Sequence, residues 1–160
     1  EAYENCRQIT KREAKNFFYA FVTLPSDKRN AIYAAYAFCR YCDDAVDQEL
    51  DTDSKLTKLQ DLRLQLESAT QGSPEGPMFT ALAHAANVYN IPSQYFDEVI
   101  NGVEMDLTKS RYQTFEELQL YCYRVASVVG LICIQIFGYK SPVAKQHAIN
   151  LGLAMQLTNI

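Results

Sequence analysis

Tryptophan is absent from this sequence of 160 residues, and histidine occurs only twice. Six glycines and five prolines leave few positions at which a helix has to break. No window alternates strictly between apolar and polar residues, as a half-buried strand would. There is also no basic stripe, and the net charge is −4 with a pI near 5.2. These absences argue against a β-sheet protein and against a nucleic-acid-binding protein.

The cysteines are also informative, because they are odd in number and lie in apolar helical stretches (Cys6, Cys39, Cys42, Cys122 and Cys133). Free thiols packed in this way are typical of a reducing compartment, so we expect a cytoplasmic protein. Cys39-x-x-Cys42 has no second pair at zinc-site spacing, since His84 and His147 are isolated. No signal peptide is visible, and the longest apolar run, residues 125–137, is shorter than the ~20 residues that a bilayer span needs.

Helical periodicity predicts a single all-α domain over residues 1–160, built of helices joined by short turns. We expect these helices at residues 3–24, 26–48, 54–70, 78–89, 92–109 and 115–137 and from 141 to the end of the chain. Pro25 ends the first helix, Ser26 caps the second, which runs to about Gln48, and Asp53 or Ser54 caps the third.

The later boundaries have clear local signals. Residues 71–77 contain two glycines and two prolines and are expected to form a surface loop. Thr114-x-x-Glu117 is a capping box that opens a helix, and Gly138 ends it. The last helical pattern reaches Ile160 without a C-cap, so we expect the domain to be a truncated fragment.

One acidic cluster stands at the end of the second helix. Asp43 and Asp47 share a helical face, Asp44 flanks it, and Arg40 lies one turn before Asp44. Carboxylates this close repel one another unless a positive charge lies between them, and Mg²⁺ is bound by one or two carboxylates together with water and phosphate oxygens. The cluster therefore predicts a magnesium site at the mouth of a pocket, or else an exposed, frayed helix end.

Two later helices combine apolar surface with small or polar residues. The small residues of the stretch 121–130 allow either close helix packing or room for a ligand. Gln156 and Asn159 are three residues apart on one face of an apolar helix, where an unpaired amide costs free energy. They are expected either to form hydrogen bonds in the core or to face a polar ligand.

Four motifs in order resemble the squalene/phytoene synthase family, in a bacterial form. They are Lys15-Asn16-Phe17-Phe18-Tyr19-Ala20-Phe21 before Leu24-Pro25, Arg40-x-x-Asp43-Asp44-x-x-Asp47, Tyr121-Cys122-x-x-Val125-Ala126-x-x-Val129-Gly130 and Leu151-Gly152-x-Ala154-x-Gln156-x-Thr158-Asn159-Ile160. The resemblance implies an isoprenoid synthase helical bundle around a central apolar cavity. It also implies Mg²⁺-dependent head-to-head condensation of two prenyl diphosphates, to phytoene from C20 units or to presqualene diphosphate and squalene from C15 units. NADPH is expected only if squalene is the product.

The resemblance also implies roles for individual residues. Asp43, Asp47 and Asn159 would bind Mg²⁺, and Arg40 and Lys15 would neutralise phosphate oxygens. A dry cavity would protect the carbocation from water, and aromatic faces could stabilise it. The remaining substrate-binding residues implied in this way are Asn16, Phe17, Tyr36, Asp44, Tyr123, Val125, Val129 and Gln156, with Tyr36 also among the catalytic residues.

The sequence departs from the family pattern in three places. Glu13-Ala14-Lys15-Asn16 stands where relatives carry small hydroxylated residues, and Ser127 replaces a glycine, which we expect to narrow the cavity. The chain also stops before a second aspartate motif, so we expect the 160 residues alone to be inactive.

The alternative function is a non-catalytic relative that acts as a binding or assembly factor. The N-terminal segment slightly favours a C15 substrate, peripheral contact with the cytoplasmic membrane is expected, and the oligomeric state is open.

Overall fold

The computed structural model describes residues 1–47 and 49–160, and the described chain is helical without strands. Nine α-helices and one short π-helical segment, η1, follow one another: α1 (Ala2–Glu13), α2 (Lys15–Phe21), α3 (Ser26–Asp47), α4 (Thr52–Thr70), α5 (Gly76–Tyr89), α6 (Ser93–Thr108), α7 (Phe115–Cys122), η1 (Tyr123–Ser127), α8 (Val128–Phe137) and α9 (Val143–Leu157). The predicted all-α class is therefore confirmed. The expected end of α3 at Gln48 lies outside the described residues.

The first expected helix, residues 3–24, is wrong as a single element. The backbone leaves the helical region at Ala14, with φ −133° and ψ 58°, and α2 starts in a new direction. Packing explains the break: α1 buries Cys6 and Ile9, whereas α2 turns so that Phe18 stacks on Tyr33 of α3 at a ring-centroid distance of 5.6 Å. A straight helix could not satisfy both contacts.

The helix ends follow local chemistry, with two corrections. Ser26 does not cap α3 but is its first residue, and the Pro25 carbonyl accepts the first hydrogen bond, from Arg29 N at 2.9 Å. Asp51, rather than Asp53 or Ser54, caps α4, because its carboxylate accepts the Ser54 backbone N–H at 2.9 Å. An aspartate at this position satisfies an N–H group that the helix leaves free.

The capping box that opens α7 is confirmed. Thr114 Oγ1 accepts the Glu117 backbone N–H at 3.2 Å, and the Glu117 carboxylate accepts the Gln113 N–H, also at 3.2 Å. Gly138 ends α8 with φ +81°, a conformation that favours glycine. These two helix ends are therefore specified by the local sequence.

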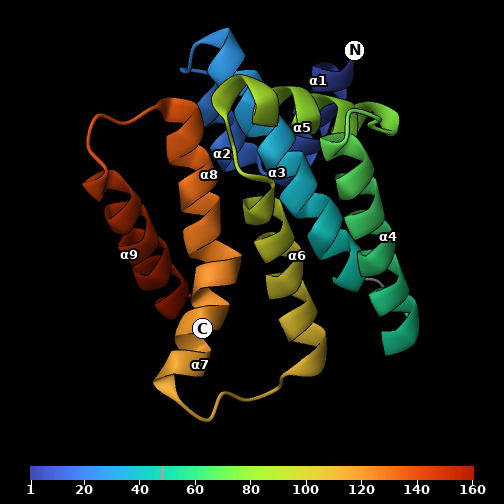
Figure 1. Ribbon diagram of the computed structural model, residues 1–160, viewed down its shortest axis with the longest axis vertical. Coiled ribbons are helices and arrows are strands. Elements are labelled where there is room, and N and C mark those ends of the chain that lie inside the picture. The colour runs from blue at the N-terminus through green and yellow to red at the C-terminus, as the bar shows by residue number, and fades with distance from the viewer. Residues whose placement is uncertain (48) are drawn as a thin grey trace.

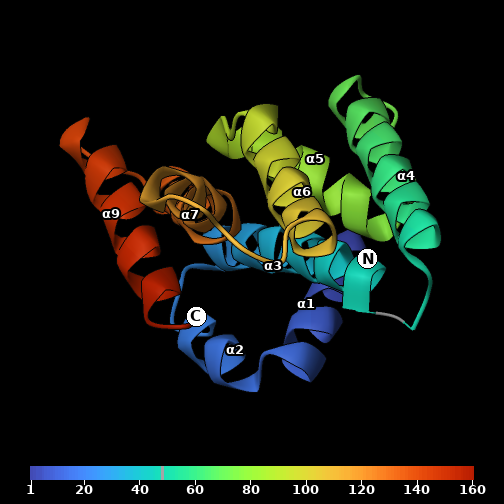
Figure 2. The same ribbon diagram turned by 90° about the horizontal axis from the view of Figure 1, so that it is seen from below.

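The helices are arranged around α3, which packs against α1, α4, α5, α6 and α8. Figure 1 shows α4, α6 and α8 side by side, with α9 on the outside of α8. Seen from below, α3 lies between α1 and α2 on one side and α6 and α7 on the other, with α9 at the left edge (Figure 2). The C-terminal half of α3 carries the acidic cluster.

Residues Phe115–Phe137 form a continuous helical run of 23 residues. Among the described residues it is the one helix that is long and apolar enough to cross a membrane by length and composition, so the expectation that the apolar run of residues 125–137 is too short is wrong for the whole helix. In the structure it packs against α6 on one side and α9 on the other. A core helix of a folded domain has the same length and composition, so the run indicates no membrane span by itself.

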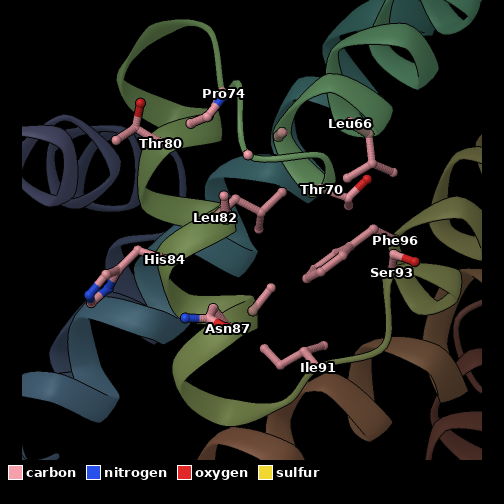
Figure 3. Close-up of a pocket in the computed structure, with 14 residues that line it drawn as sticks. Leu66, Thr70, Pro74, Thr80, Leu82, His84, Asn87, Ile91, Ser93 and Phe96 are labelled. Atoms are coloured by element: carbon pink, nitrogen blue, oxygen red, sulfur yellow. The ribbon is translucent and has the colours of Figure 1, made fainter.

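A pocket of about 590 Å³ lies between the C-terminal end of α4, α5 and the start of α6. Its floor is apolar, and Figure 3 shows Leu66, Leu82, Ile91 and Phe96 around it, with the hydroxyl groups of Thr70 and Ser93 at its edge. The acidic cluster of α3 does not line this pocket. We therefore assign it no part in the chemistry discussed below.

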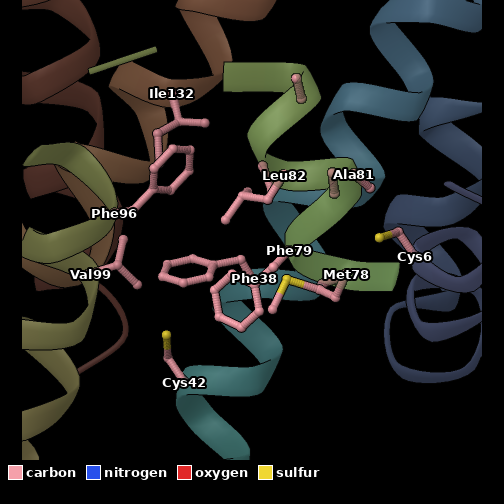
Figure 4. Packing of buried hydrophobic residues seen from close by; sticks show 14 of the residues in the cluster. Cys6, Phe38, Cys42, Met78, Phe79, Ala81, Leu82, Phe96, Val99 and Ile132 are labelled. Atoms are coloured by element: carbon pink, nitrogen blue, oxygen red, sulfur yellow. The ribbon is translucent and has the colours of Figure 1, made fainter. Parts of the chain in front are cut away.

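The core is centred on Phe38 in the middle of α3 (Figure 4). Its ring lies edge-on to Phe96 of α6 at 5.3 Å and to Phe79 of α5 at 6.4 Å between centroids. All three rings are at most 2% exposed. Such aromatic contacts add to the free energy gained by burying the rings, so Phe38 ties three helices together.

Replacing Phe38 with alanine is expected to reduce the free energy of unfolding by about 3–5 kcal/mol, because it removes a fully buried ring and leaves a cavity. Phe115→Ala is the matched control, since Phe115 is 55% exposed and its loss should cost about 0.5 kcal/mol or less. Urea denaturation followed by circular dichroism measures both. Equal effects of the two substitutions would contradict this view of the core.

Candidate functional site

The acidic cluster of α3 is held by its own arginine. Arg40 Nε donates to Asp44 Oδ1 at 2.8 Å, and Arg40 Nη2 lies 3.6 Å from Asp47 Oδ2. These contacts follow from helical spacing, since residues four apart, and seven apart over two turns, lie on one face. Arg40 was expected to neutralise phosphate; in this structure it neutralises two carboxylates, so its role toward a substrate stays a prediction.

Asp43 is the carboxylate that Arg40 does not bind. Partial burial raises the pKa of Asp43 against the opposing effect of Arg40, and together with the negative charges of Asp47, Asp44 and Asp106 it brings the value to about 6. The side chain nevertheless keeps contact with solvent. Burial and the three nearby carboxylates both disfavour the charged form of Asp43, and a bound cation would favour it.

Asp106 and Tyr121 belong to this cluster and were missed in the sequence. Asp106 on α6 lies close enough to act on Asp43, and it also lies close enough to Tyr121 to raise the pKa of the tyrosine. Glu104, two residues earlier, points the other way and pairs with Arg63 of α4. Two residues apart on a helix, Glu104 and Asp106 cannot share a face, but their spacing does not show which of them meets α3.

The predicted N-terminal substrate segment forms a pocket of about 430 Å³. The break at Ala14 allows residues from both α1 and α2 to line it, together with Tyr36 of α3. The lining comprises Arg12, Glu13, Ala14, Lys15, Asn16, Phe17 and Tyr36. The structure thus brings together four of the expected site residues and adds Arg12 and Glu13, which sequence reasoning did not select.

This pocket and the acidic cluster are neighbours. Arg12 lies near enough to Asp44 and Arg40 for their charges to affect it, and Glu13 is influenced by Arg40. Tyr36 connects the two parts, because it lines the pocket and also lies near Arg40 and Asp43 of the cluster. Burial raises the pKa of Tyr36, and the charges of Arg40 and Asp43 act on it as well. The site therefore combines cationic side chains, an acidic helix end and the aromatic residues Phe17 and Tyr36.

The small residues of the stretch 121–130 serve close helix packing. Ser127 is fully buried, and its Oγ donates to the Ile149 carbonyl of α9 at 2.7 Å. The expectation that Ser127 narrows a cavity is therefore wrong, because its side chain is directed to α9. The other expected wall residues of this stretch, Tyr123, Val125 and Val129, are half-buried.

Gln156 and Asn159 lie at the end of α9, which packs against α7, η1 and α8. Gln156 is half-buried and Asn159 is exposed. The core-hydrogen-bond alternative finds no support, since neither side chain has a hydrogen-bond partner among the described residues. The structure does not bring Asn159 together with Asp43 and Asp47, so its role as a metal ligand stays a prediction.

Within the described residues, no three histidine, cysteine or carboxylate side chains converge as a complete metal cage. A site for Mg²⁺ does not need one, because this ion keeps several waters and takes one or two carboxylates together with phosphate oxygens. Asp43 suits such a site, because its raised pKa shows that its negative charge is poorly compensated by the protein alone. Asp43 and Asp47 are the side chains that would hold the ion.

A sequence profile of the squalene/phytoene synthase family matches residues 10–160. The chain belongs to the squalene/phytoene synthase family. The predicted resemblance is thereby confirmed.

Related sequences of this family include phytoene synthases. That of Arthrospira platensis is 40% identical over 173 aligned positions, which cover all of this chain and 56% of that protein. That of Mycobacterium tuberculosis is 38% identical over 160 positions, which cover all of this chain and 52% of that protein. The chain therefore spans about half the length of the relatives it matches.

Solved structures of the family share the fold. A dehydrosqualene synthase in complex with a ligand is 33% identical with a TM-score of 0.86, covering 99% of this chain and 55% of that one. The squalene synthase HpnC from Alicyclobacillus acidocaldarius is 30% identical with a TM-score of 0.90, covering 99% of this chain and 59% of that one. The helical architecture is therefore that of the squalene synthases.

Asp43→Asn is expected to stabilise the protein at neutral pH. The folded-state pKa of Asp43, about 6, lies above its ordinary value of 3.8, so the folded state loses stability as the pH rises from about 4 to 6. Because solvent reaches the carboxyl, the gain should be no more than about 1 kcal/mol at pH 7 and absent below pH 4.

Urea denaturation at several pH values measures this effect, and Asp51→Asn provides a control of opposite sign. Hydrogen bonds from Ser54 lower the pKa of Asp51, so this carboxylate stabilises the fold above its ordinary pKa. Asp51→Asn should therefore reduce stability at pH 7. Destabilisation of the Asp43→Asn protein at pH 7 would disprove the electrostatic account of Asp43.

Proposed function

We propose that this chain forms part of a prenyl transferase that condenses two prenyl diphosphates head to head. The observation that carries the proposal is the continuity of the acidic cluster on α3 with the pocket of Lys15, Asn16, Phe17 and Tyr36. The similarity to phytoene synthases and squalene synthases supports the same reaction class. The acidic motif is intact, which favours an enzyme over a binding or assembly factor.

The charged side chains would bind the diphosphate end of the substrate. Lys15 and Arg12 supply positive charge on the side of α1 and α2, and Arg40 supplies it on α3. Mg²⁺ held by Asp43 and Asp47 would supply the further positive charge that stabilises the diphosphate as it leaves. Arg40 would then exchange part of its pairing with Asp44 and Asp47 for phosphate oxygens.

The apolar side chains would protect the carbocation that remains after the diphosphate leaves. Phe17 and Tyr36 offer aromatic faces, which attract a cation through their negative π-surfaces. Tyr123, Val125 and Val129 would line the path of the prenyl chains. Excluding water here matters, because water would convert the cation to an alcohol.

The test is a product assay of a chain extended past Ile160 to the length of its relatives, incubated with Mg²⁺ and with C15 or C20 prenyl diphosphate. A C30 or C40 hydrocarbon or its diphosphate precursor, identified by mass spectrometry, is expected. Asp43→Ala and Asp47→Ala should each reduce the rate at least about 100-fold, because they remove the charge that stabilises the leaving group. The 160 residues alone should release no diphosphate.

Glu75→Ala is a suitable control, since Glu75 is an exposed carboxylate at the start of α5 and does not line the proposed site. It should leave the rate unchanged. Adding NADPH to the C15 reaction distinguishes squalene from presqualene diphosphate as the product. Absence of product from either substrate in a folded protein would refute the proposal and favour the binding or assembly factor.

A further inference from the structure

The helical run from α7 to α8 contains one turn of π-helix. The Val128 N–H donates to the Tyr123 carbonyl, five residues back, instead of four residues back as in an α-helix. Such a turn accommodates one extra residue between two α-helical parts. On one side α7 carries Tyr121, and on the other side α8 is anchored in the core by Val128 and Ile132.

Two glycines on neighbouring helices form close contacts with this turn. A Cβ atom on Gly152 of α9 would lie 2.4 Å from the Ser127 Cα atom, and one on Gly102 of α6 would lie 2.9 Å from both Arg124 Cβ and Val125 Cγ1. Contacts below about 3.0 Å do not occur without movement of the neighbouring atoms. The turn is therefore clasped between α6 and α9, at a spacing that only glycine permits.

Polar contacts fix the turn in the same two directions. Arg124 Nε donates to Glu98 Oε2 of α6 at 2.7 Å, and Ser127 Oγ donates to the Ile149 carbonyl of α9 at 2.7 Å. Arg124 and Glu98 are 25% and 20% exposed, so their pairing is only partly screened by water. The same helices thus hold the turn by shape and by charge.

The extra residue determines how α7 is rotated relative to α8. Each residue of an α-helix turns the chain by about 100°. If the same sequence continued as regular α-helix from the anchored α8, Tyr121 would be rotated away by about that angle. It would then lose its ring contact with Tyr112, now 5.2 Å between centroids, and its place beside Asp106.

We infer that η1, clasped by Gly102 and Gly152, is a positioning element that places Tyr121 beside Asp106 and so beside the acidic cluster of α3. Its importance for turnover rests on the proposed function, but the placement of Tyr121 does not. Gly152, Gly102, Ser127 and the Glu98–Arg124 pair are then positioning residues that act through Tyr121.

Gly152→Ala tests the clasp, and Gly130→Ala is the matched control. Gly130 faces the same helix α9, but its added Cβ would meet the Ala148 carbonyl oxygen at 3.2 Å, which requires a much smaller adjustment. The measurement is the NMR titration of ¹³Cζ-labelled tyrosine in the chain extended past Ile160, with Tyr121 assigned through Tyr121→Phe. Burial and the nearby Asp106 raise the pKa of Tyr121 above the ordinary 10.0.

In the Gly152→Ala protein the pKa of Tyr121 should fall toward 10, and the nuclear Overhauser contact between the rings of Tyr112 and Tyr121 should disappear. Gly130→Ala should leave both unchanged. Ser127→Ala provides a milder variant in case Gly152→Ala does not fold, and it should shift Tyr121 in the same direction. An unchanged Tyr121 in a folded Gly152→Ala protein, or in the Ser127→Ala protein if the former does not fold, overturns the inference.

Deletion of Ala126 tests the rotation itself. It removes the extra residue, so a regular α-helix can then join α7 and α8 without changing their relative rotation. Tyr121 should keep its raised pKa and its contact with Tyr112, and loss of both in a folded protein would contradict the inference.

Prenyl transfer is measured in parallel on the same variants. If Tyr121 responds as expected but neither the parent protein nor any variant has activity, the proposed function fails while the positioning role stands.

Discussion

The burial of one face of α3 is the constraint on which the rest of the structure depends. Phe38, Cys42 and Ala45 are buried at spacings of four and three residues, which is the repeat of a helix face directed into a core. Because each residue turns the helix by about 100°, Asp43 and Asp47 project beside that face rather than into it. The aromatic contacts of Phe38 with α5 and α6 therefore determine where the carboxylates emerge, and they place α6 so that Asp106 meets Asp43.

The acidic cluster places carboxylates close together, and Arg40 compensates their negative charge only in part. Arg40 binds Asp44 and approaches Asp47, so two of the three carboxylates on α3 have a positive partner within the same helix. Asp43 has three negative neighbours, and its raised pKa means that folding disfavours its charged form. Groups held in unfavourable surroundings are common where a ligand supplies the missing interaction. A diphosphate with its cation has the charge pattern that would do so, with positive charge at the carboxylates and negative oxygens at the nearby arginine and lysine side chains.

The sequence predicted those features that arise within one helix or at its ends. The acidic face of α3, the capping box of Thr114 and the stop at Gly138 depend on residues within a few positions of one another, and all are present. Contacts between helices could not be predicted in the same way. The break at Ala14 follows from the separate packing of α1 and α2, and the participation of Asp106 follows from the position of α6. Neither leaves a local signal, since Ala14 lies within a good helical pattern and Glu104 was an equally acidic alternative.

The glycines within helices also depend on contacts between helices, which the sequence does not reveal. Gly102 and Gly152 each weaken their helices by about 1 kcal/mol relative to alanine, so local propensity alone gives no reason for them. Small residues near η1 had left open whether they make room for a ligand or for another helix. The structure shows that they make room for another helix: the glycines, Ser127 and the Val125 side chain meet where α6 and α9 approach the turn. Close packing on two sides thus holds the turn firmly, which a uniform α-helix with larger residues could not do at the same spacing.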